Sequence, residues 1–247
     1  MTPTPQSFVS EIVRFVLPAR RVADFARLRA QIASHGAVLS QYYGPTMPAR
    51  SSLAVRVDEM CWVINWRSRP TNLATQLAAL GDHGATSLLF EFKSSQEAAL
   101  AKALDVPLCQ FVSIASQEQP IPSLTLLQAT INVVAKAPTG NPDFQASMHK
   151  TYTDCFLADD GFVGGDWAYA SNTNRTNGQP LCTESASEPS TQILPLDRRL
   201  AVYFLGWTSH AAHDAYSATP LFAEEIDKLK SWFGPGTGAW YVQFAKH

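Results

Sequence analysis

Two short stretches of sequence decide the interpretation of the fold: residues 64–70 read INWRSRP, and residues 205–211 read LGWTSHA. Each completes an apolar run that favours a β-strand, MCWVINW over residues 60–66 and RLAVYFLGW over residues 199–207. In both, the strand ends in Trp-x-Ser, and the serine stands where it can accept a backbone N–H bond at the start of a helix. The match indicates that one structural unit occurs twice.

The elements around the first strand predict the order β-α-β-β-α-β. Residues 11–17 (EIVRFVL) alternate as an opening strand, and a helix follows with an apolar stripe of Val22, Phe25, Leu28 and Ile32. Later elements are a short strand at residues 37–43, a helix with the stripe Leu73, Leu77 and Leu80, and a strand at residues 87–92. We expect a further short strand, residues 109–114, at the edge of this first half.

The second half repeats the same order after a linker with closely spaced prolines at residues 117–122. Its expected elements are an opening strand at 126–134, a helix with the stripe Phe144, Met148, Tyr152 and Cys155, a glycine-rich strand at 161–170, a helical region at 209–232 that Pro220 interrupts, and a closing strand at 239–244. The polar insertion at residues 171–192 predicts a surface loop, which could act as a lid.

A single βαββαβ unit covers one face of its sheet with helices and leaves the other face bare. Two copies in one chain can bury those bare faces against each other. We therefore predict an α+β protein with two tandem ferredoxin-like units, residues 1–118 and 123–247. The units would form an intramolecular α/β barrel of the dimeric type, with the helices outside and a cavity between sheet and helices in each half.

Composition excludes several classes of partner. The 247 residues carry 19 basic and 21 acidic side chains, for a formal charge of −2, and no basic stripe suited to nucleic acid. No signal peptide and no stretch of about 18 apolar residues is apparent. We expect a soluble, cytoplasmic monomer or homodimer that binds a small molecule and neither nucleic acid nor membrane.

The sequence also lacks the spacing patterns of common cofactor sites. The four cysteines form no CxxC pair, and the six histidines have no metal-ligand spacing with cysteine or carboxylate. Phosphate-binding glycine loops, HExxH and GxSxG are missing as well. We therefore predict that no metal, haem or flavin is required.

Three segments carry a resemblance to a known family: residues 11–17, Tyr42-Tyr43-Gly44, and residues 206–222 (GWTSHAAHDAYSATPLF). They resemble the fungal branch of the antibiotic biosynthesis monooxygenase-like (ABM), dimeric α/β barrel superfamily. The resemblance implies a cofactor-independent enzyme of secondary metabolism that cyclises, dehydrates or isomerises polyketide or aromatic compounds by acid/base catalysis. Its alternatives are a cofactor-free monooxygenase of a phenol or anthrone, and a non-catalytic binding or stress-response protein. Tyr216 stands where the family's helix pattern has a histidine.

We predict that the second half holds the working pocket, because the first half's inward stripes are aliphatic apart from Phe25 and offer no proton-transfer group. His149 and Tyr152 are three residues apart on one helix, so they project to one side, with His149 as general base and Tyr152 as its partner. The opposing interpretation is an exposed His149 and a core Tyr152. Asp166, beside Trp167, could act as a base or could cap a turn.

Helix phase and strand alternation place the remaining candidates. A core stripe of Ala211, Ala215, Ala218 and Phe222 would turn His213, a weaker catalytic candidate, away from the core and leave Tyr216 at its edge. Alternation sends Tyr203 and Trp207 to one strand face, where they would form an aromatic wall. The predicted substrate-binding residues are Tyr203, Trp207, Tyr216, Asn132 and Trp240.

Overall fold

The computed structural model of the protein describes residues 7–48, 55–68, 80, 85–106, 108–114, 141–174, 192–230, 232–233 and 238–247. Its first half contains β1 (Ser7–Val16), α1 (Val22–Ala33), β2 (Val38–Pro48), β3 (Glu59–Trp66), β4 (Thr86–Lys93) and α3 (Glu97–Leu104). The rest contains β5 (Leu108–Ile114), α4 (Pro142–Lys150), β6 (Phe162–Tyr169), β7 (Ala201–Trp207), α5 (His210–Ser217), α6 (Pro220–Lys230), β8 (Gly238–Val242) and β9 (Ala245–Lys246). The predicted α+β class is confirmed.

The strands form one antiparallel sheet in the order β4-β1-β3-β2-β8-β5-β7-β6, with β9 paired to β2. Its two end strands also meet, because Phe90 of β4 bridges to Ala170 just after β6. Beside this bridge, the side-chain amide of Asn172 accepts from the Leu89 N–H at 3.0 Å and donates to the Ser87 carbonyl at 2.9 Å. These bonds close the ring of strands.

β5 lies in a different place from the one that the sequence suggests. The expectation was an edge strand of the first half, but β5 is antiparallel to both β7 and β8 and lies between them. It thereby holds the position among the second-half strands that β1 holds between β3 and β4. A local pattern predicts a strand but not its partners. The opening strand expected at 126–134 lies outside the described residues.

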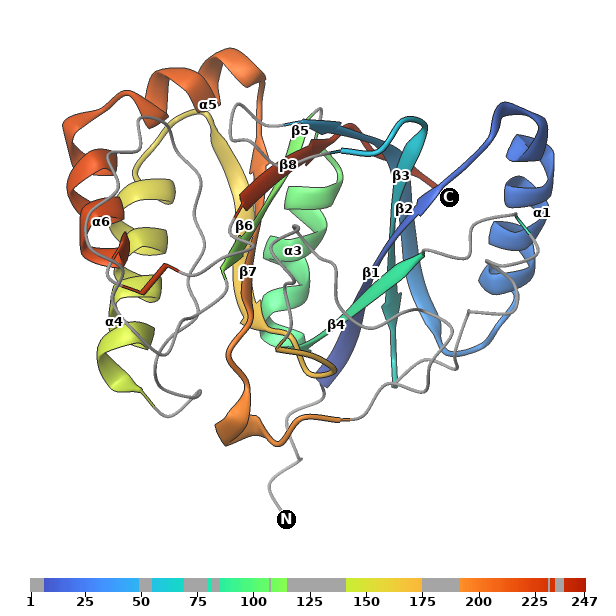
Figure 1. The fold of residues 1–247 in the computed structure, drawn as a ribbon, viewed down its shortest axis with the longest axis horizontal. Coiled ribbons are helices and arrows are strands. Elements are labelled where there is room, and N and C mark those ends of the chain that lie inside the picture. The colour runs from blue at the N-terminus through green and yellow to red at the C-terminus, as the bar shows by residue number, and fades with distance from the viewer. Residues whose placement is uncertain are drawn as a thin grey trace.

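Helices flank the strands on both sides of the molecule, and α3 lies between the two groups of strands with one face exposed. Figure 1 shows α1 beside the β1–β4 strands, α4, α5 and α6 beside the opposite strands, and α3 between the two groups. The inner core joins both halves, because Ile12 and Val63 pack in one cluster with Phe204 and with Leu100 of α3. α3, which the sequence analysis does not predict, approaches β7 closely where Gly206 leaves room. A Cβ atom there would lie 2.6 Å from the Ala103 Cα.

Most of the apolar side chains in the predicted helix stripes are buried. Phe25, Leu28 and Ile32 of α1 are buried, whereas Val22, at the first helical position, is exposed. The predicted interruption at Pro220 separates α5 from α6. Leu80 is buried, while Leu73 and Leu77 lie outside the described residues. Within the part of the chain that the structure describes, no helix has the length and apolar character needed to cross a bilayer.

Candidate functional site

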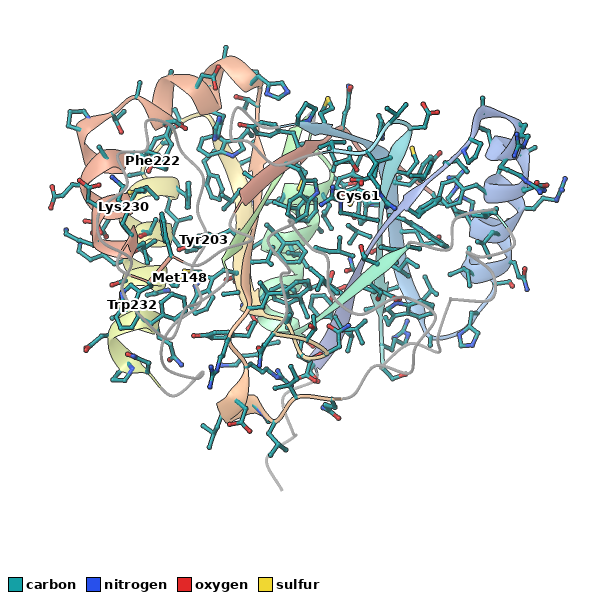
Figure 2. All side chains as sticks on the ribbon, in the orientation of Figure 1. Cys61, Met148, Tyr203, Phe222, Lys230 and Trp232 are labelled. Atoms are coloured by element: carbon teal, nitrogen blue, oxygen red, sulfur yellow. The ribbon has the colours of Figure 1, made fainter. Side chains whose placement is uncertain are left out.

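The layer between the second-half strands and helices α4, α5 and α6 is rich in aromatic side chains. Strand alternation places Tyr203, Leu205 and Trp207 on one face of β7, as predicted. This face meets the helices, and all three side chains are fully buried. Figure 2 shows Tyr203 facing α4, which carries Met148, with Phe222 and Trp232 in the same layer. We call this second-half cluster the aromatic layer. Its other buried aromatic members are Phe144, Phe156, Tyr169, Tyr216 and Tyr241.

His213 lies inside this layer, in contrast to the prediction from helix phase. It is 8% exposed and Tyr216 is 4% exposed, whereas Ala211 and Ala215 are on the exposed side of α5. The phase prediction is wrong because it used Phe222 to orient the stripe. Phe222 belongs to α6, and α5 ends at Ser217, so the two helices have independent phases. Tyr216, expected at the edge of the stripe, is buried in the aromatic layer, and its role in binding stays a prediction.

Side chains from three elements surround the His213 imidazole. Its Nδ1 lies 2.9 Å from the Tyr241 hydroxyl of β8, and its Nε2 lies 3.2 Å from the Ser217 hydroxyl. The imidazole also meets the Trp207 ring edge to face, with centroids 5.2 Å apart. A histidine bonded to two hydroxyls can accept a proton in either tautomer, because a hydroxyl can both donate and accept. We call His213, Tyr241 and Ser217 the imidazole cluster.

The imidazole cluster lies one side chain beneath the surface. His210, the first residue of α5, is exposed, and its ring meets the Tyr241 ring edge to face at 4.6 Å between centroids. Asp214 follows His213 in α5, and its Oδ1 is 3.5 Å from His213 Nδ1. The imidazole cluster is thus bordered by the exposed His210 ring and by the Asp214 carboxylate.

His149 and Tyr152 are not brought together in the way that their spacing suggests. His149 is exposed, whereas Tyr152 is half-buried and donates to the Gly165 carbonyl at 2.7 Å. α4 ends at Lys150 and continues as a π-helical turn, Thr151–Phe156, so a spacing argument for a uniform α-helix does not apply. Burial, with a smaller contribution from the Asp166 carboxylate, raises the pKa of Tyr152 to about 12. Tyr152 therefore keeps its proton near neutral pH.

Asp166 and Tyr203 have structural partners. The Asp166 carboxylate accepts from the Gln96 amide at 2.8 Å and from the Trp167 backbone N–H at 2.8 Å. Asp166 lies within β6, so these bonds do not form the turn cap that was weighed against a catalytic role, and its role stays a prediction. The Tyr203 hydroxyl donates to the Met148 carbonyl at 2.7 Å, which ties β7 to α4.

Trp240 does not contribute to the aromatic layer. β8 alternates, so Ala239 and Tyr241 face the helices while Trp240 faces the inner core. There the Trp240 ring stacks on Phe111 at 5.0 Å, and the Arg14 guanidinium lies 5.2 Å from its centroid. The predicted placement of Trp240 at the second-half site is therefore wrong. Asn132 lies outside the described residues, and its role stays a prediction.

The first half contains an acidic group that the sequence analysis missed. Glu11, in the middle of β1, is 4% exposed and accepts from the Trp66 indole N–H at 3.0 Å and the Ser87 hydroxyl at 2.7 Å. Burial raises its pKa to about 7, against the lowering effect of these two bonds. Glu11 lies on a strand, outside the helix stripes on which the comparison of the two halves was based. One available signal was an acidic residue on an otherwise apolar strand face, beside Val9 and Val13.

Metal ligands do not gather within the described ranges, where no group of three or more His, Cys, Asp and Glu side chains could hold an ion. The three cysteines placed by the structure, Cys61, Cys109 and Cys155, are buried thiols, as their apolar surroundings predict. Burial is the main cause that raises the pKa of each thiol, so these thiols are poor nucleophiles. The prediction that no metal or cofactor is needed stays a prediction.

Comparison with known proteins provides structural likeness only. No protein-family model and no curated protein matches the chain. Among solved structures, an "anthrone oxidase-like protein" aligns with a TM-score of 0.53 and 6% identity, over 98% of this chain and 93% of that chain. A "putative monooxygenase" from Lactobacillus acidophilus NCFM aligns with a TM-score of 0.50 and 9% identity, over 97% and 94% of the two chains.

A further "putative monooxygenase", from Fusobacterium nucleatum, has a TM-score of 0.51 and 6% identity, over 99% of this chain and 95% of that chain. Each alignment spans nearly the whole of both chains, so the likeness extends over both halves of this chain. At these identities the likeness establishes the fold and leaves the reaction to be argued from the site.

Proposed function

We propose that the protein is a cofactor-independent monooxygenase that oxidises a flat, electron-rich aromatic compound of the phenol or anthrone class. The observation that carries the proposal is the imidazole cluster within the aromatic layer. A group able to take a proton, His213, touches Trp207 and bonds the Tyr241 hydroxyl. The likeness to an anthrone oxidase-like protein and two monooxygenases supports this chemistry over cyclisation or dehydration.

The proposed reaction needs only a base and dioxygen. His213 removes a proton from the acidic CH2 group of an anthrone, and the electron pair of that C–H bond remains as a delocalised anion. The anion donates its electrons to dioxygen, and a C–O bond forms. The peroxide regains a proton from His213, and loss of water then leaves a carbonyl. One oxygen atom enters the product and the other leaves as water, so the substrate supplies all of the electrons.

The residues of this chain would hold the substrate and its charge. Aromatic side chains such as Trp207 and Tyr216 suit a flat ring, because aromatic pairs gain free energy beyond the area that they bury. The Tyr241 hydroxyl would orient the imidazole, and Asp214 would stabilise its protonated form. The substrate is thus a small aromatic molecule, and no macromolecular partner is invoked.

The finer architecture belongs to the same proposal. The strand orders β4-β1-β3-β2 and β8-β5-β7-β6 are equivalent, and each group carries a tryptophan at the end of its third strand, Trp66 or Trp207. We take each group, with its helices, as one ferredoxin-like unit of an intramolecular barrel of the dimeric type. The first unit would then end near β4, and β5 would open the second.

The test measures oxygen use by the purified protein with 1,8-dihydroxyanthrone in a Clark-type electrode, without added cofactor and with a chelator present. We expect one dioxygen molecule to be consumed for each molecule oxidised, without accumulation of hydrogen peroxide. Conversion that continues under nitrogen would replace the proposal with an acid/base cyclase or dehydratase. Binding without turnover in air would leave a binding protein instead.

A further inference from the structure

The carboxyl group of Glu11 is held in the first half by two neutral donors. The Trp66 indole N–H donates to one carboxyl oxygen at 3.0 Å, and the Ser87 hydroxyl donates to the other at 2.7 Å. These side chains come from β3 and β4, the two strands that flank β1. We call Glu11, Trp66 and Ser87 the carboxyl cluster. No ion pair reaches Glu11 within the described residues, so no cation offsets the cost of burying its charge.

The sheet position of Glu11 does not require a carboxylate. Glu11 pairs with Ile64 of β3 and Leu89 of β4. In the second half, Gln110 of β5 holds the equivalent register position, because it pairs with Leu205 of β7 and Tyr241 of β8. Glutamine is the uncharged isostere of glutamate. One half of the molecule therefore places a neutral residue where the other places an acid, and an acid retained without a cation calls for a chemical role.

The carboxyl cluster also lies near the surface. Trp66 is itself buried, but the ring of His35, an exposed residue after α1, meets the Trp66 ring edge to face at 6.1 Å between centroids. The first half thus repeats an arrangement of the second, where exposed His210 covers Tyr241 of the imidazole cluster. In both halves a buried proton-transfer group is separated from an exposed imidazole by one aromatic side chain.

We propose that the carboxyl cluster is a second small-molecule site, separate from the imidazole cluster, at which Glu11 accepts the proton of a phenol. In this step the phenol O–H bond breaks, the proton moves to a Glu11 carboxyl oxygen, and the electron pair stays on the phenolate oxygen. The Trp66 N–H and the Ser87 hydroxyl, which bond the carboxylate beforehand, become available to the phenolate. One negative charge is kept beside the same two donors, and no oxidant or reductant is needed.

The chemistry of the cluster selects the class of ligand. A carboxyl with a pKa of about 7 can exchange a proton with a phenol of similar acidity, whereas an ordinary exposed carboxylate is too weak a base. The indole favours an aromatic ring for the body of the ligand.

The experiment follows 4-nitrophenol, whose ionised form absorbs visible light, as it is titrated into the full-length protein near neutral pH. The variants are Glu11→Gln, which copies the residue of the second half, and His213→Asn, which changes only the imidazole cluster. We expect Glu11→Gln to weaken the binding of 4-nitrophenol at least tenfold. The variant should also lack the visible absorbance change that reports ionisation of 4-nitrophenol bound to the parent. His213→Asn should bind and ionise 4-nitrophenol at the carboxyl cluster as the parent does. Thermal melting establishes that both variants fold.

Three outcomes would overturn the inference. Glu11→Gln could bind and ionise 4-nitrophenol as the parent does, which would leave Glu11 with a structural role. Binding could disappear only in His213→Asn, which would place the phenol in the second half. The parent could fail to bind the probe at all. Oxygenase activity that survives in Glu11→Gln does not affect the inference, and loss of activity in His213→Asn bears only on the proposed function.

Discussion

The two halves of the molecule place an indole at the end of the same strand but put different chemistry beside it. Trp66 ends β3 and donates to the Glu11 carboxyl, whereas Trp207 ends β7 and packs edge to face on the His213 imidazole. The carboxyl is bonded by an indole and a hydroxyl, and the imidazole by two hydroxyls. One scaffold thus places two kinds of titratable group beside equivalent tryptophans, and a shared fold does not determine the reaction.

The halves also differ in the free energy needed to bury the charged form of their titratable groups. Glu11 is desolvated without a cation, so its charged form is disfavoured and its folded-state pKa is raised. His213 has Asp214 beside it, so a proton taken up there meets an opposite charge. Substitutions that alter one cluster at a time can separate a catalytic role from a structural one.

The largest expected effect is on the imidazole cluster. His213→Asn should lower the turnover of an anthrone by about two to four orders of magnitude, because a general base is lost. Asparagine can still bond the Tyr241 hydroxyl, so the melting temperature should fall by only a few degrees. Steady-state oxygen consumption and a thermal melt measure the two quantities. Full turnover in this variant would remove His213 from the mechanism.

Glu11→Gln should change how stability depends on pH. Burial raises the pKa of Glu11 from its ordinary value of 4.5 to about 7, so between these values the folded state holds a proton that the unfolded state has released. Stability therefore falls as pH rises through this window, by on the order of 3 kcal/mol. Glutamine does not titrate, so the variant should lack this loss and be the more stable protein at alkaline pH.

Urea unfolding of the parent and the variant at about pH 5 and pH 8 measures this difference. Glu97→Gln, at an exposed position in the first turn of α3, is the matched control for removal of one carboxylate. Its pH dependence should follow that of the parent. Parallel curves for Glu11→Gln and the parent would show that the Glu11 carboxyl is solvated or paired with a cation.

Sequence patterns predicted the local features of this comparison. Alternation identifies β3 and β7 and the β7 side chains that share one face, because the period of a strand is a property of consecutive residues. α3 was missed although residues 97–104 (EAALAKAL) are nearly all strong helix formers. That signal was present in the sequence and could have been used.

Features that depend on residues distant in the sequence could not be predicted from local patterns. The environment of Glu11 is made by Trp66 and Ser87, which are 55 and 76 residues away in the chain. The pairing of β5 with β7 and β8 is likewise non-local. His213 was placed on the wrong side because a break between two short helices resets their phase. Burial and partner choice are tertiary properties, and a single sequence leaves them open.

Two tyrosine variants test the same comparison of the two halves, with smaller expected effects on turnover and stability. Tyr241→Phe removes the hydroxyl beside His213 Nδ1, and Tyr152→Phe removes the donor to the Gly165 carbonyl. Each loses one buried or half-buried hydrogen bond, so each should cost about 1 kcal/mol of stability. Only Tyr241→Phe should also lower turnover, by roughly tenfold, because it alone leaves the imidazole poorly oriented. Equal turnover in both variants would contradict an orienting role for Tyr241.

The smallest expected effect is that of His149→Ala, at the residue that spacing alone makes the favoured base. A general base must come within hydrogen-bond reach of the proton that it removes. His149 is exposed, on the side of α4 away from the buried Phe144 and Met148. Turnover should therefore equal that of the parent, and the free energy of unfolding should change by less than about 0.5 kcal/mol, as for most surface substitutions. A loss of a hundredfold or more, measured beside His213→Asn, would move the reaction to the outer face of α4 and return His149 to the role that its sequence position suggests.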